Sequence, residues 1–399
     1  MPLTSRWLNF ADSELIAQTR WQCYGHSGKD LVRMRDYTLM DRRAQDGDFL
    51  IVEENGRPVA TSTSLSMRLW ARSAAFDCQG VAWVGAIKSA RRRGAAREAM
   101  NQTLRKARER EQVISALMPF RVSYYENFGY GIVERRAEWC IPLELLPQQN
   151  PTGDWHIFSP SDQPNLSALR KRCVETGQCN IERTPAGWTV CRAADEHGLT
   201  FCSAAGCWVT FIHQAADGKD VLKVSDWGAA TLADLLDLFH FLGTLRDQYF
   251  SLVIPLPADW QINRLLSESQ LPHRPVNHLT AEVSTITRMQ VRILDHAKFL
   301  SGLHIPIWAK GRVEIEIPEP EGTKSRFGLE LDAGRITIKP ASGSSGFICP
   351  AIHWASIATG DLPATQAVRM GLAAEETPGA AAILDALSVG PLPFCQEYF

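Results

Sequence analysis

The sequence predicts an α/β (α+β) protein built from three consecutive domains. In the first part of the chain an apolar strand pattern runs into a short basic turn and then into a helix, and a second succession of strands and helices follows a Pro- and Gly-containing linker. From Met289 the pattern changes to alternating strands followed by helices, which is typical of an antiparallel sheet with helices beside it. The predicted domains are 1–148, 149–287 and 288–399.

Composition places the chain among ordinary globular proteins. It has 399 residues, 45% of them hydrophobic and 22% charged, and a net charge of −2, so there is no overall attraction to nucleic acid or membranes. No secretory signal and no apolar run of membrane-spanning length is visible, and we expect a cytoplasmic protein. The ten cysteines are scattered without a C-x-x-C pair, which favours reduced, mostly buried thiols over a metal site.

The first domain begins with helical and then strand patterns. Residues 12–45 are polar with a helical tendency, Phe49–Val52 has the pattern of a buried strand, and Asn55-Gly56 is a hairpin turn signal before the alternating stretch Val59–Trp70. Five side chains of the helical region are pocket candidates, although each is equally consistent with core packing or an exposed position: Trp21, Tyr24, His26, Tyr37 and Asp41.

The basic turn Arg91–Ala96 stands between an apolar strand and the helix that runs from Ala95 to about Arg110. The first amides of a helix have no internal partner and lie at the positive end of its dipole, so a phosphate group fits there. Gly94 lets the backbone approach a ligand closely, and the arginines supply charge-assisted hydrogen bonds. A solvated basic turn or a nucleic-acid patch would have the same local pattern.

The following context favours the phosphate interpretation. R-x-x-G-x-A after a strand, followed by Tyr125-Glu126-Asn127-Phe128-Gly129-Tyr130-Gly131, resembles the acyl-CoA loop and the Y-x-x-F-G-Y motif of the GNAT acetyltransferases. This resemblance implies a GNAT (acyl-CoA N-acyltransferase) fold, acetyl-CoA as cosubstrate and no metal. The residues implied to bind the cosubstrate are Val84, Gly85, Ala86, Arg92, Arg93, Gly94, Ala95, Ala96, Arg97 and Phe120. In such a fold Val84–Ala86 would pair with the pantetheine arm.

The second domain repeats the alternation without the basic loop. Its expected elements are helices at Leu166–Thr176 and Leu232–Asp247 and strands at Gly187–Arg192, Leu199–Cys202, Cys207–His213, Val221–Asp226 and Tyr249–Ile254. Between the fourth strand and the second helix stands Gly228-Ala229-Ala230-Thr231, which contains no arginine. We therefore expect a second GNAT-like domain that has lost the cofactor loop.

The third domain is expected to be α+β. A strand entering a helix at Gln290–Asp295 precedes three alternating strands at Arg312–Ile317, Gly328–Leu331 and Arg335–Ile338, and then helices at His353–Gly360, Ala367–Met370 and Ala380–Leu387. The aromatic tail ends at Phe399.

This three-part arrangement, with its aromatic C-terminus, resembles the Eis (enhanced intracellular survival) acetyltransferases over essentially the whole chain. The resemblance implies a sterol-carrier-protein-like third domain, a homohexamer and acetylation of amines. It also implies that Tyr125 is the general acid and that the carboxylate of Phe399 is the general base.

The acceptor amine stays open. The acidic residues that line the acceptor pocket in well-known Eis proteins have no match here, and residues 20–37 are richer in Arg, Lys and His. A polycation such as an aminoglycoside favours carboxylates, so a protein lysine or a small-molecule amine is an alternative acceptor. A lipid-binding scaffold without enzymatic activity and nucleic-acid binding through Arg91–Arg93 are the alternatives from other classes, the latter disfavoured by the near-neutral charge.

Overall fold

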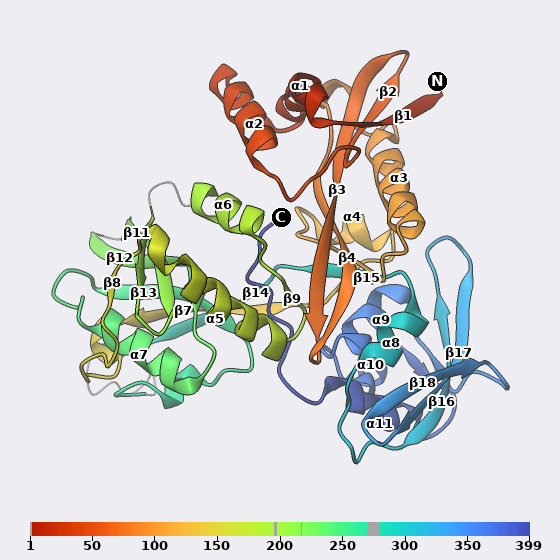
Figure 1. Ribbon diagram of the computed structural model, residues 1–399. Helices are drawn as coiled ribbons and strands as arrows, with labels where there is room; N and C mark the ends of the chain where they lie inside the picture. The colour runs from red at the N-terminus through yellow and green to blue at the C-terminus, as the bar shows by residue number, and fades with distance from the viewer. Residues whose placement is uncertain (1, 195–197, 217, 270–278) are drawn as a thin grey trace.

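The computed structural model describes residues 2–194, 198–216, 218–269 and 279–399. Within these residues the chain forms three β-sheets with helices packed beside them, which confirms the predicted mixed α/β architecture. Figure 1 shows the N-terminal part at the top, the central part on the left and the C-terminal part at the lower right. None of the helices in the described part is long and apolar enough to cross a membrane.

The first sheet has the strand order β1-β2-β3-β4-β5-β15-β6, and the short β9 pairs with β3. Neighbours pair antiparallel except for β4 and β5, which are parallel. The hairpin predicted at Asn55-Gly56 joins β2 to β3. The elements are β1 (Leu3–Leu8), α1 (Ser13–Tyr24), α2 (Gly28–Met40), β2 (Phe49–Glu54), β3 (Arg57–Ala71), β4 (Ala74–Ala86), α3 (Ala95–Glu109), β5 (Ile114–Leu117), α4 (Val122–Glu126), β6 (Gly131–Ile132), β9 (Asn180–Ile181) and β15 (Gln290–Ile293).

The second sheet has the order β14-β7-β13-β12-β11-β10-β8. Its elements are β7 (Arg135–Pro142), β8 (His156–Ile157), α5 (Gln163–Thr176), α6 (Pro185–Ala194), β10 (Leu199–Cys202), β11 (Trp208–Ala216), β12 (Lys219–Gly228), α7 (Leu232–Gly243), β13 (Ser251–Pro257) and β14 (Glu282–Thr287). The strand predicted at Gly187–Arg192 is wrong, because these residues belong to α6. Pro185 fits the first helical position, and the buried Trp188 packs edge-on against Trp208 at 5.4 Å, so tertiary packing overrides the strand preference of Thr189 and Val190.

The third sheet has the order β18-β17-β16-β19-β20, and its first three strands pair antiparallel as predicted. Its elements are α8 (His296–Gly302), β16 (Gly311–Pro318), β17 (Lys324–Asp332), β18 (Arg335–Pro340), β19 (Phe347–Ile348), α9 (Ala351–Ala358), α10 (Ala364–Arg369), β20 (Ala374–Glu375) and α11 (Ala380–Leu384). Short 3₁₀ helices lie at Phe10–Asp12, Lys88–Ala90, Leu143–Leu145, Pro160–Asp162, Ile262–Arg264 and Asp385–Ser388.

Two strands connect the sheets. β7 follows the first sheet in sequence but pairs with β13 and β14 in the second sheet, whereas β15 follows β14 and returns between β5 and β6. One continuous core then joins the first sheet to the C-terminal part, from Leu8 and Phe49 through Trp354 to Phe399. The second sheet has a core of its own around Leu238 and Phe239.

Gly131, the last residue of the Y-x-x-F-G-Y-G motif, marks the contact of the first sheet with α9. A Cβ there would lie 1.7 Å from the backbone oxygen of Ile352, and that oxygen cannot move without shifting the helix. The hydroxyl of Ser356, one turn further along α9, donates to the oxygen of Ile132 at 2.5 Å. This glycine of the motif therefore serves packing.

We predict that Gly131→Ala destabilises the protein by about 1–3 kcal/mol, because the added methyl overpacks a backbone contact. Thermal unfolding measures the effect. Gly343→Ala is the matched control, since a Cβ at this exposed position meets nothing within 4 Å. Equal melting temperatures for the two variants would contradict the packing role of Gly131.

Candidate active site

The parallel strands β4 and β5 separate at one end and leave a notch in the first sheet. Their pairing ends at Val81 and Leu117, while β4 continues to Ala86 paired with β3 alone. The register with β3 shifts between Thr61 and Thr63, and the opposite residue Trp83 has a φ of +55°. Such a bulge bends the strand and ends regular pairing. The edge of β4 that faces β5 is thus unpaired at Val84–Ala86.

Gly85 on β4 packs directly against α1, a contact that the sequence does not reveal. A Cβ there would lie 2.7 Å from the hydroxyl of Tyr24 and 3.0 Å from the Cβ of Cys23, both on α1. The Tyr24 hydroxyl donates to the carbonyl of Val84, and its ring packs edge-on against Trp83 at 5.8 Å. The glycine therefore admits α1 to the bulged strand.

The basic loop leads into α3 as the motif predicts. Gly94 is the N-cap residue with a φ of +87°, a left-handed conformation that favours glycine, and no side chain caps the first turn of the helix. A Cβ at Gly94 would meet nothing within 4 Å, so the space over the turn is open. Arg92 also has a positive φ, of +62°. The amides of the first turn of α3 are thus open to an anion.

The cationic side chains of the loop are not equivalent. Arg92 and Arg97 are exposed, whereas Arg93 pairs with Glu54 at 3.1 Å and donates to the oxygen of Ser89 at 3.2 Å. Ala95 is buried, and Ala96 is half-buried at the start of α3. Arg93 must therefore leave Glu54 before it can contact a ligand at the helix start.

The helix start of the second sheet differs in its cap. Thr231 caps α7 by accepting a hydrogen bond from the amide of Asp234, and the Asp234 carboxylate accepts from the amides of Ala230 and Thr231, each at 3.0 Å. This reciprocal capping box fills the place where an anion would bind. The first turn of α3 is thus open, whereas that of α7 is occupied by its own capping residues.

Tyr125 lies on α4, beside the point where the two strands separate. It is 3% exposed and belongs to a buried cluster with Val81, Val84, Met100, Leu104, Leu117, Phe128 and Tyr130. Phe120, which is 70% exposed, lies edge-on to Tyr125 at 5.6 Å. Burial raises the pKa of Tyr125 above its ordinary value, so the hydroxyl stays protonated well beyond neutral pH.

Three other tyrosines lie near Tyr125. The buried Tyr130 shares a hydrogen bond of 2.7 Å with the hydroxyl of Ser115, and the Tyr24 hydroxyl is bound to Val84. The hydroxyl of Tyr124 is buried and has no hydrogen-bond partner among the described residues, and burial raises the pKa of Tyr124 to about 12. Sequence reasoning missed Tyr124, because only burial without a partner marks it.

A large cavity of 1130 Å³ opens beyond Tyr24 and Trp83, between the first two sheets. It is lined by α1 and α2, by α6 and by the C-terminal tail. Three of the five pocket candidates line it: Tyr24, His26 and Tyr37. The other two do not, because Trp21 donates to the oxygen of Ser27 at 2.8 Å and Asp41 pairs with Arg43 at 2.8 Å.

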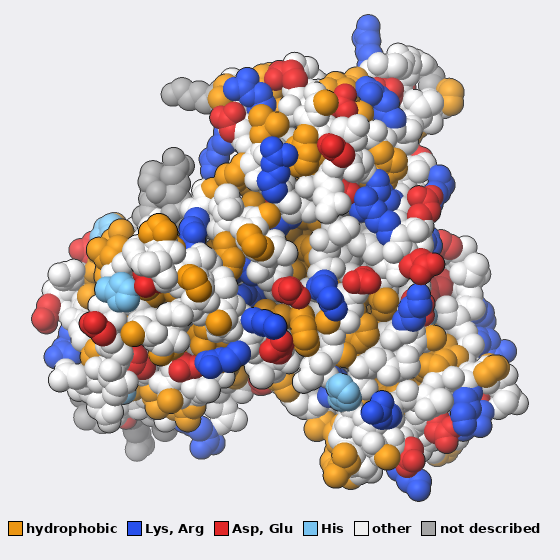
Figure 2. Space-filling view, viewed as in Figure 1, with side chains coloured by type: hydrophobic (Ala, Val, Ile, Leu, Met, Phe, Trp, Pro, Cys, Tyr) orange, Lys and Arg blue, Asp and Glu red, His pale blue; other side chains and the backbone are white. Residues whose placement is uncertain are grey.

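The carboxylates of the cavity wall are already engaged. Asp226 pairs with Arg183 at 2.7 Å, and Glu397 accepts from Arg183 at 2.5 Å and from Arg170 at 3.2 Å. Asp30 accepts from the amides of His26 and Ser27 at the start of α2. Asp36 is exposed beside Arg35. Arg33 and Arg288 also line the cavity. On the face shown in Figure 2 acidic and basic side chains are interspersed, without a large basic area.

The tail reaches this region from the far end of the sequence. Figure 1 shows the C-terminus near the centre of the molecule, between α4 and α6. Three arginines hold the tail: Arg43 after α2 donates to the oxygen of Tyr398 at 2.7 Å, Arg136 on β7 to the oxygen of Cys395, and Arg170 on α5 to Gln396 at 2.5 Å. The tail is thus docked.

Phe399 itself is 8% exposed and packs in the core shared by the first and third sheets. It lines a smaller cavity of 360 Å³ next to the large one, together with Arg42, Arg43 and Met67. Glu397 borders both cavities. In the described part of the chain, no hydrogen bond, ion pair or ring contact joins Phe399 to Tyr125.

Residues 6–133 match the family model of the acetyltransferase (GNAT) domain, and this segment contains the notch, the open helix start and Tyr125. The chain carries a GNAT acetyltransferase domain. It is accordingly a transferase, an N-acetyltransferase of the GNAT type, as the basic loop and the Y-x-x-F-G-Y-G motif predict. The non-enzymatic scaffold is thereby disfavoured.

The likeness to known proteins extends beyond this GNAT domain. A protein of Streptomyces avermitilis described as an uncharacterized N-acetyltransferase is 24% identical over 380 residues, which is 87% of each chain. The fold is similar to a GCN5-related N-acetyltransferase from Anabaena variabilis, with a TM-score of 0.85 and 17% identity. It is also similar to Eis1 from Mycobacterium abscessus, with a TM-score of 0.82 and 18% identity, and both comparisons cover 100% of each chain. The whole architecture is therefore Eis-like.

We predict that Arg183→Met destabilises the protein by about 3–5 kcal/mol, because it leaves Asp226 and Glu397 buried without their shared partner. The tail should also become sensitive to carboxypeptidase. Thermal unfolding and mass spectrometry of the digested C-terminus measure the two effects. Arg108→Met is the control, since its pair with Glu321 is exposed on both sides and contributes at most about 1 kcal/mol. A tail as resistant in Arg183→Met as in the control would contradict this role.

Proposed function

We propose that the protein transfers an acetyl group from acetyl-CoA to an amine by direct attack at the notch between β4 and β5. The observation that carries this proposal is the notch itself, which has an open helix start at one end and the protonated, buried Tyr125 beside it. These three features lie within the segment that matches the GNAT model, and GNAT acetyltransferases use acetyl-CoA.

The cosubstrate fits the residues that the sequence indicates. The first-turn amides at Gly94–Ala96 would hold the pyrophosphate, with Arg92 and Arg97 beside it and Arg93 after it leaves Glu54. The pantetheine arm would lie along Val84–Ala86 as an added strand, and Phe120 would cover it at the mouth of the notch. The cosubstrate supplies a thioester whose carbonyl carbon accepts the amine nitrogen.

Tyr125 acts as the general acid. As the carbon–sulfur bond breaks, the leaving thiolate takes the proton of the Tyr125 hydroxyl, and solvent reprotonates the tyrosine. The raised pKa keeps this proton available at neutral pH. Backbone amides near Val84–Ala86 would stabilise the oxygen of the tetrahedral intermediate.

The carboxylate of Phe399 acts as the general base that removes a proton from the incoming ammonium, directly or through a water. Glu397 is the nearest acidic alternative in sequence, but its carboxylate oxygen already accepts hydrogen bonds from Arg170 and Arg183 and is not directed at an incoming amine. The arginines that grip the tail carbonyls fix the position of the chain end next to the large cavity.

The acceptor would enter through the large cavity. Because the carboxylates of its wall are engaged by the protein, a polycationic aminoglycoside would find few free counter-charges. A protein lysine or a small-molecule amine is the better match. From the Eis resemblance we also propose a sterol-carrier-like third domain and a homohexamer, which light scattering of the purified protein tests.

A panel of amines tests the proposed reaction. Mass spectrometry of the acceptor after incubation with acetyl-CoA should show a gain of one or more acetyl groups on lysine peptides or small amines of low charge, and little or none on aminoglycosides. If no amine of any class is acetylated while acetyl-CoA binds, direct transfer to amines is wrong.

One chain should bind one CoA, because α3 has an open start and α7 is capped by its own Thr231 and Asp234. Titration calorimetry measures the stoichiometry, and two sites per chain would contradict this view of the central domain. Arg92→Ala should weaken binding without lowering the melting temperature, since exposed charges contribute little to stability.

Tyr125→Phe should lower turnover by about 10²–10⁴-fold, the usual contribution of a general acid, while CoA affinity stays near that of the wild type. The substitution removes one hydroxyl and leaves the ring packing of the cluster in place. Tyr124→Phe is the control on the same helix, and it should keep most of the activity. If Tyr125→Phe turns over normally, another group or a water donates the proton.

Blocking the terminal carboxylate should abolish transfer. An extension of one or two glycines after Phe399 moves the carboxylate away, and CoA binding should persist because the cosubstrate residues lie elsewhere. Phe399→Leu is the matched control, because it keeps a carboxylate at the same place and should stay active if it folds. Full turnover of the extended chain would show that the base is a side chain such as Glu126 or His26.

A further inference from the structure

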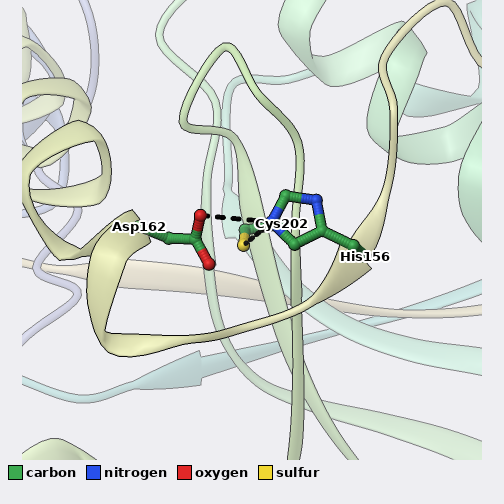
Figure 3. Close-up of side chains that lie close together, drawn as sticks. All are labelled: His156, Asp162 and Cys202. Carbon is green, nitrogen blue, oxygen red and sulfur yellow. Dashed lines mark hydrogen bonds and ion pairs between the residues drawn. The ribbon is translucent and has the colours of Figure 1, made fainter.

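A cluster of three metal-ligating side chains lies in the central domain, away from the notch. His156 on β8, Asp162 in the short helix before α5 and Cys202 on β10 point their ligand atoms toward one another, as Figure 3 shows. His156 and Cys202 are directly opposite in the antiparallel β8–β10 pair. All three ligand atoms lie within 4.8 Å of one another.

The contacts around the cluster select one nitrogen of the imidazole. The Nδ1 atom of His156 lies 3.1 Å from the backbone oxygen of Asp154. Because a carbonyl oxygen can only accept a hydrogen bond, Nδ1 is the nitrogen that carries the proton. The Nε2 atom then faces the oxygen of Asp162 at 3.1 Å and the sulfur of Cys202 at 3.7 Å. A backbone carbonyl on the far nitrogen is the usual orienting partner of a metal-bound histidine.

The carboxylate is oriented in the same way. One oxygen of Asp162 accepts from the amide of Ser159 at 2.8 Å and from its hydroxyl at 3.0 Å. The other oxygen is directed at His156. His156 and Asp162 are thus each held by a neighbouring group, while the free atom of each points to a common centre with the sulfur of Cys202.

The distances agree with a tetrahedral zinc site. With Zn–N and Zn–O bonds of about 2.0 Å and a Zn–S bond of about 2.3 Å, tetrahedral ligands stand about 3.3 Å apart (N to O) and about 3.5 Å apart (N to S). The observed separations of 3.1 Å and 3.7 Å differ from these by a few tenths of an ångström. Thiolate, imidazole and carboxylate together are a donor set that suits Zn²⁺ and does not suit Mg²⁺ or Ca²⁺.

We propose that His156, Asp162 and Cys202 form a zinc-binding site of the central domain. Cys202 binds as the thiolate, and its proton is released to solvent on binding. The side chain of His156 is 43% exposed, which leaves a route of entry and a fourth position for water. The sequence pattern of the cysteines gives no sign of this site, because the ligands are 6 and 40 residues apart and contain only one sulfur.

The place of the site predicts that a bound zinc ion stabilises the central domain, although its fourth ligand is a water. β8 is the edge strand of its sheet and pairs with β10 over two residues only. In the sequence it lies between β7 and α5, in the stretch that connects them. A bound zinc ion would fasten this short strand to β10 and to the start of α5. A nucleophilic role for Cys202 is disfavoured because its side chain is fully buried.

Zinc binding to the reduced, full-length protein tests the proposal. The protein is stripped with a chelator and titrated with ZnCl₂ in competition with a chromophoric chelator, and MgCl₂ serves as the ion control. We expect one tight zinc site per chain and a higher melting temperature with zinc, but not with magnesium. Substitution of Co²⁺ should give a thiolate-to-cobalt charge-transfer band.

Matched variants separate this site from the other thiols. Cys202→Ser and His156→Gln should each weaken zinc binding at least about tenfold, since even loss of an outer partner of a metal site typically costs ~10–100-fold. Cys207→Ser is the control, because Cys207 is equally buried nearby but lies outside the cluster. His156→Gln is included because it changes a partly exposed side chain, so it still tests the site if Cys202→Ser fails to fold. Two results would overturn the proposal: no zinc binding by the wild type, or equal zinc affinity in all three variants. Either would show that the cluster is only an ion pair beside a buried thiol.

Discussion

The separation of β4 from β5 after Val81 is the feature on which the candidate active site depends. It requires Trp83 to adopt a φ of +55°, which is unusual for a bulky residue and is maintained only where packing enforces it. Here the rings of Tyr24 and Tyr37 pack on Trp83 at 5.8 Å and 5.6 Å. The buried guanidinium of Arg20 lies 4.5 Å from the same ring. The helices that wall the large cavity are therefore the helices that hold Trp83 in the conformation that separates the two strands.

The carbonyl groups of the docked tail accept hydrogen bonds from buried arginine side chains. Guanidinium groups are costly to bury unless their donors are satisfied. Arg43 and Arg136 each use one carboxylate side chain, Asp41 and Glu134, and then donate to a backbone carbonyl of the tail. Because these donors recognise the backbone, the tail is positioned up to its last residue. This explains how a chain end, usually frayed, is held in the interior.

Sequence reasoning predicted the elements with a local signal and missed those that depend on distant contacts. The Asn55-Gly56 hairpin, the helix after Gly94 and the three strands of the third sheet follow from turn chemistry and periodicity. The helix α6 was predicted as a strand, because nothing in Gly187–Arg192 reveals that Trp188 packs against Trp208. The exchange of β7 and β15 between sheets is likewise invisible, since strand partners are set by non-local pairing.

The sequence alone also does not tell what the glycines of the site contact. Gly85 and Gly131 stand in segments that match cofactor-binding or catalytic motifs, yet one makes room for Tyr24 and the other for the backbone of α9. Gly94 is different, because nothing approaches it and its left-handed φ is required for the open helix start. Only the structure distinguishes a glycine that admits a ligand from one that admits the protein itself.

The central sheet contains the counterpart of the notch, and the protein fills it. β12 and β13 are parallel and pair from Val221 to Lys223, after which β12 continues to Gly228 without pairing to β13. Across this gap the indole nitrogen of Trp227 donates to the oxygen of Pro255 at 2.8 Å. From the tail, Gln396 donates to the oxygen of Trp227 at 2.7 Å. Trp227 and Gln396 of the tail thus fill this gap with the protein's own side chains, and the capped start of α7 that follows β12 is not open to a phosphate.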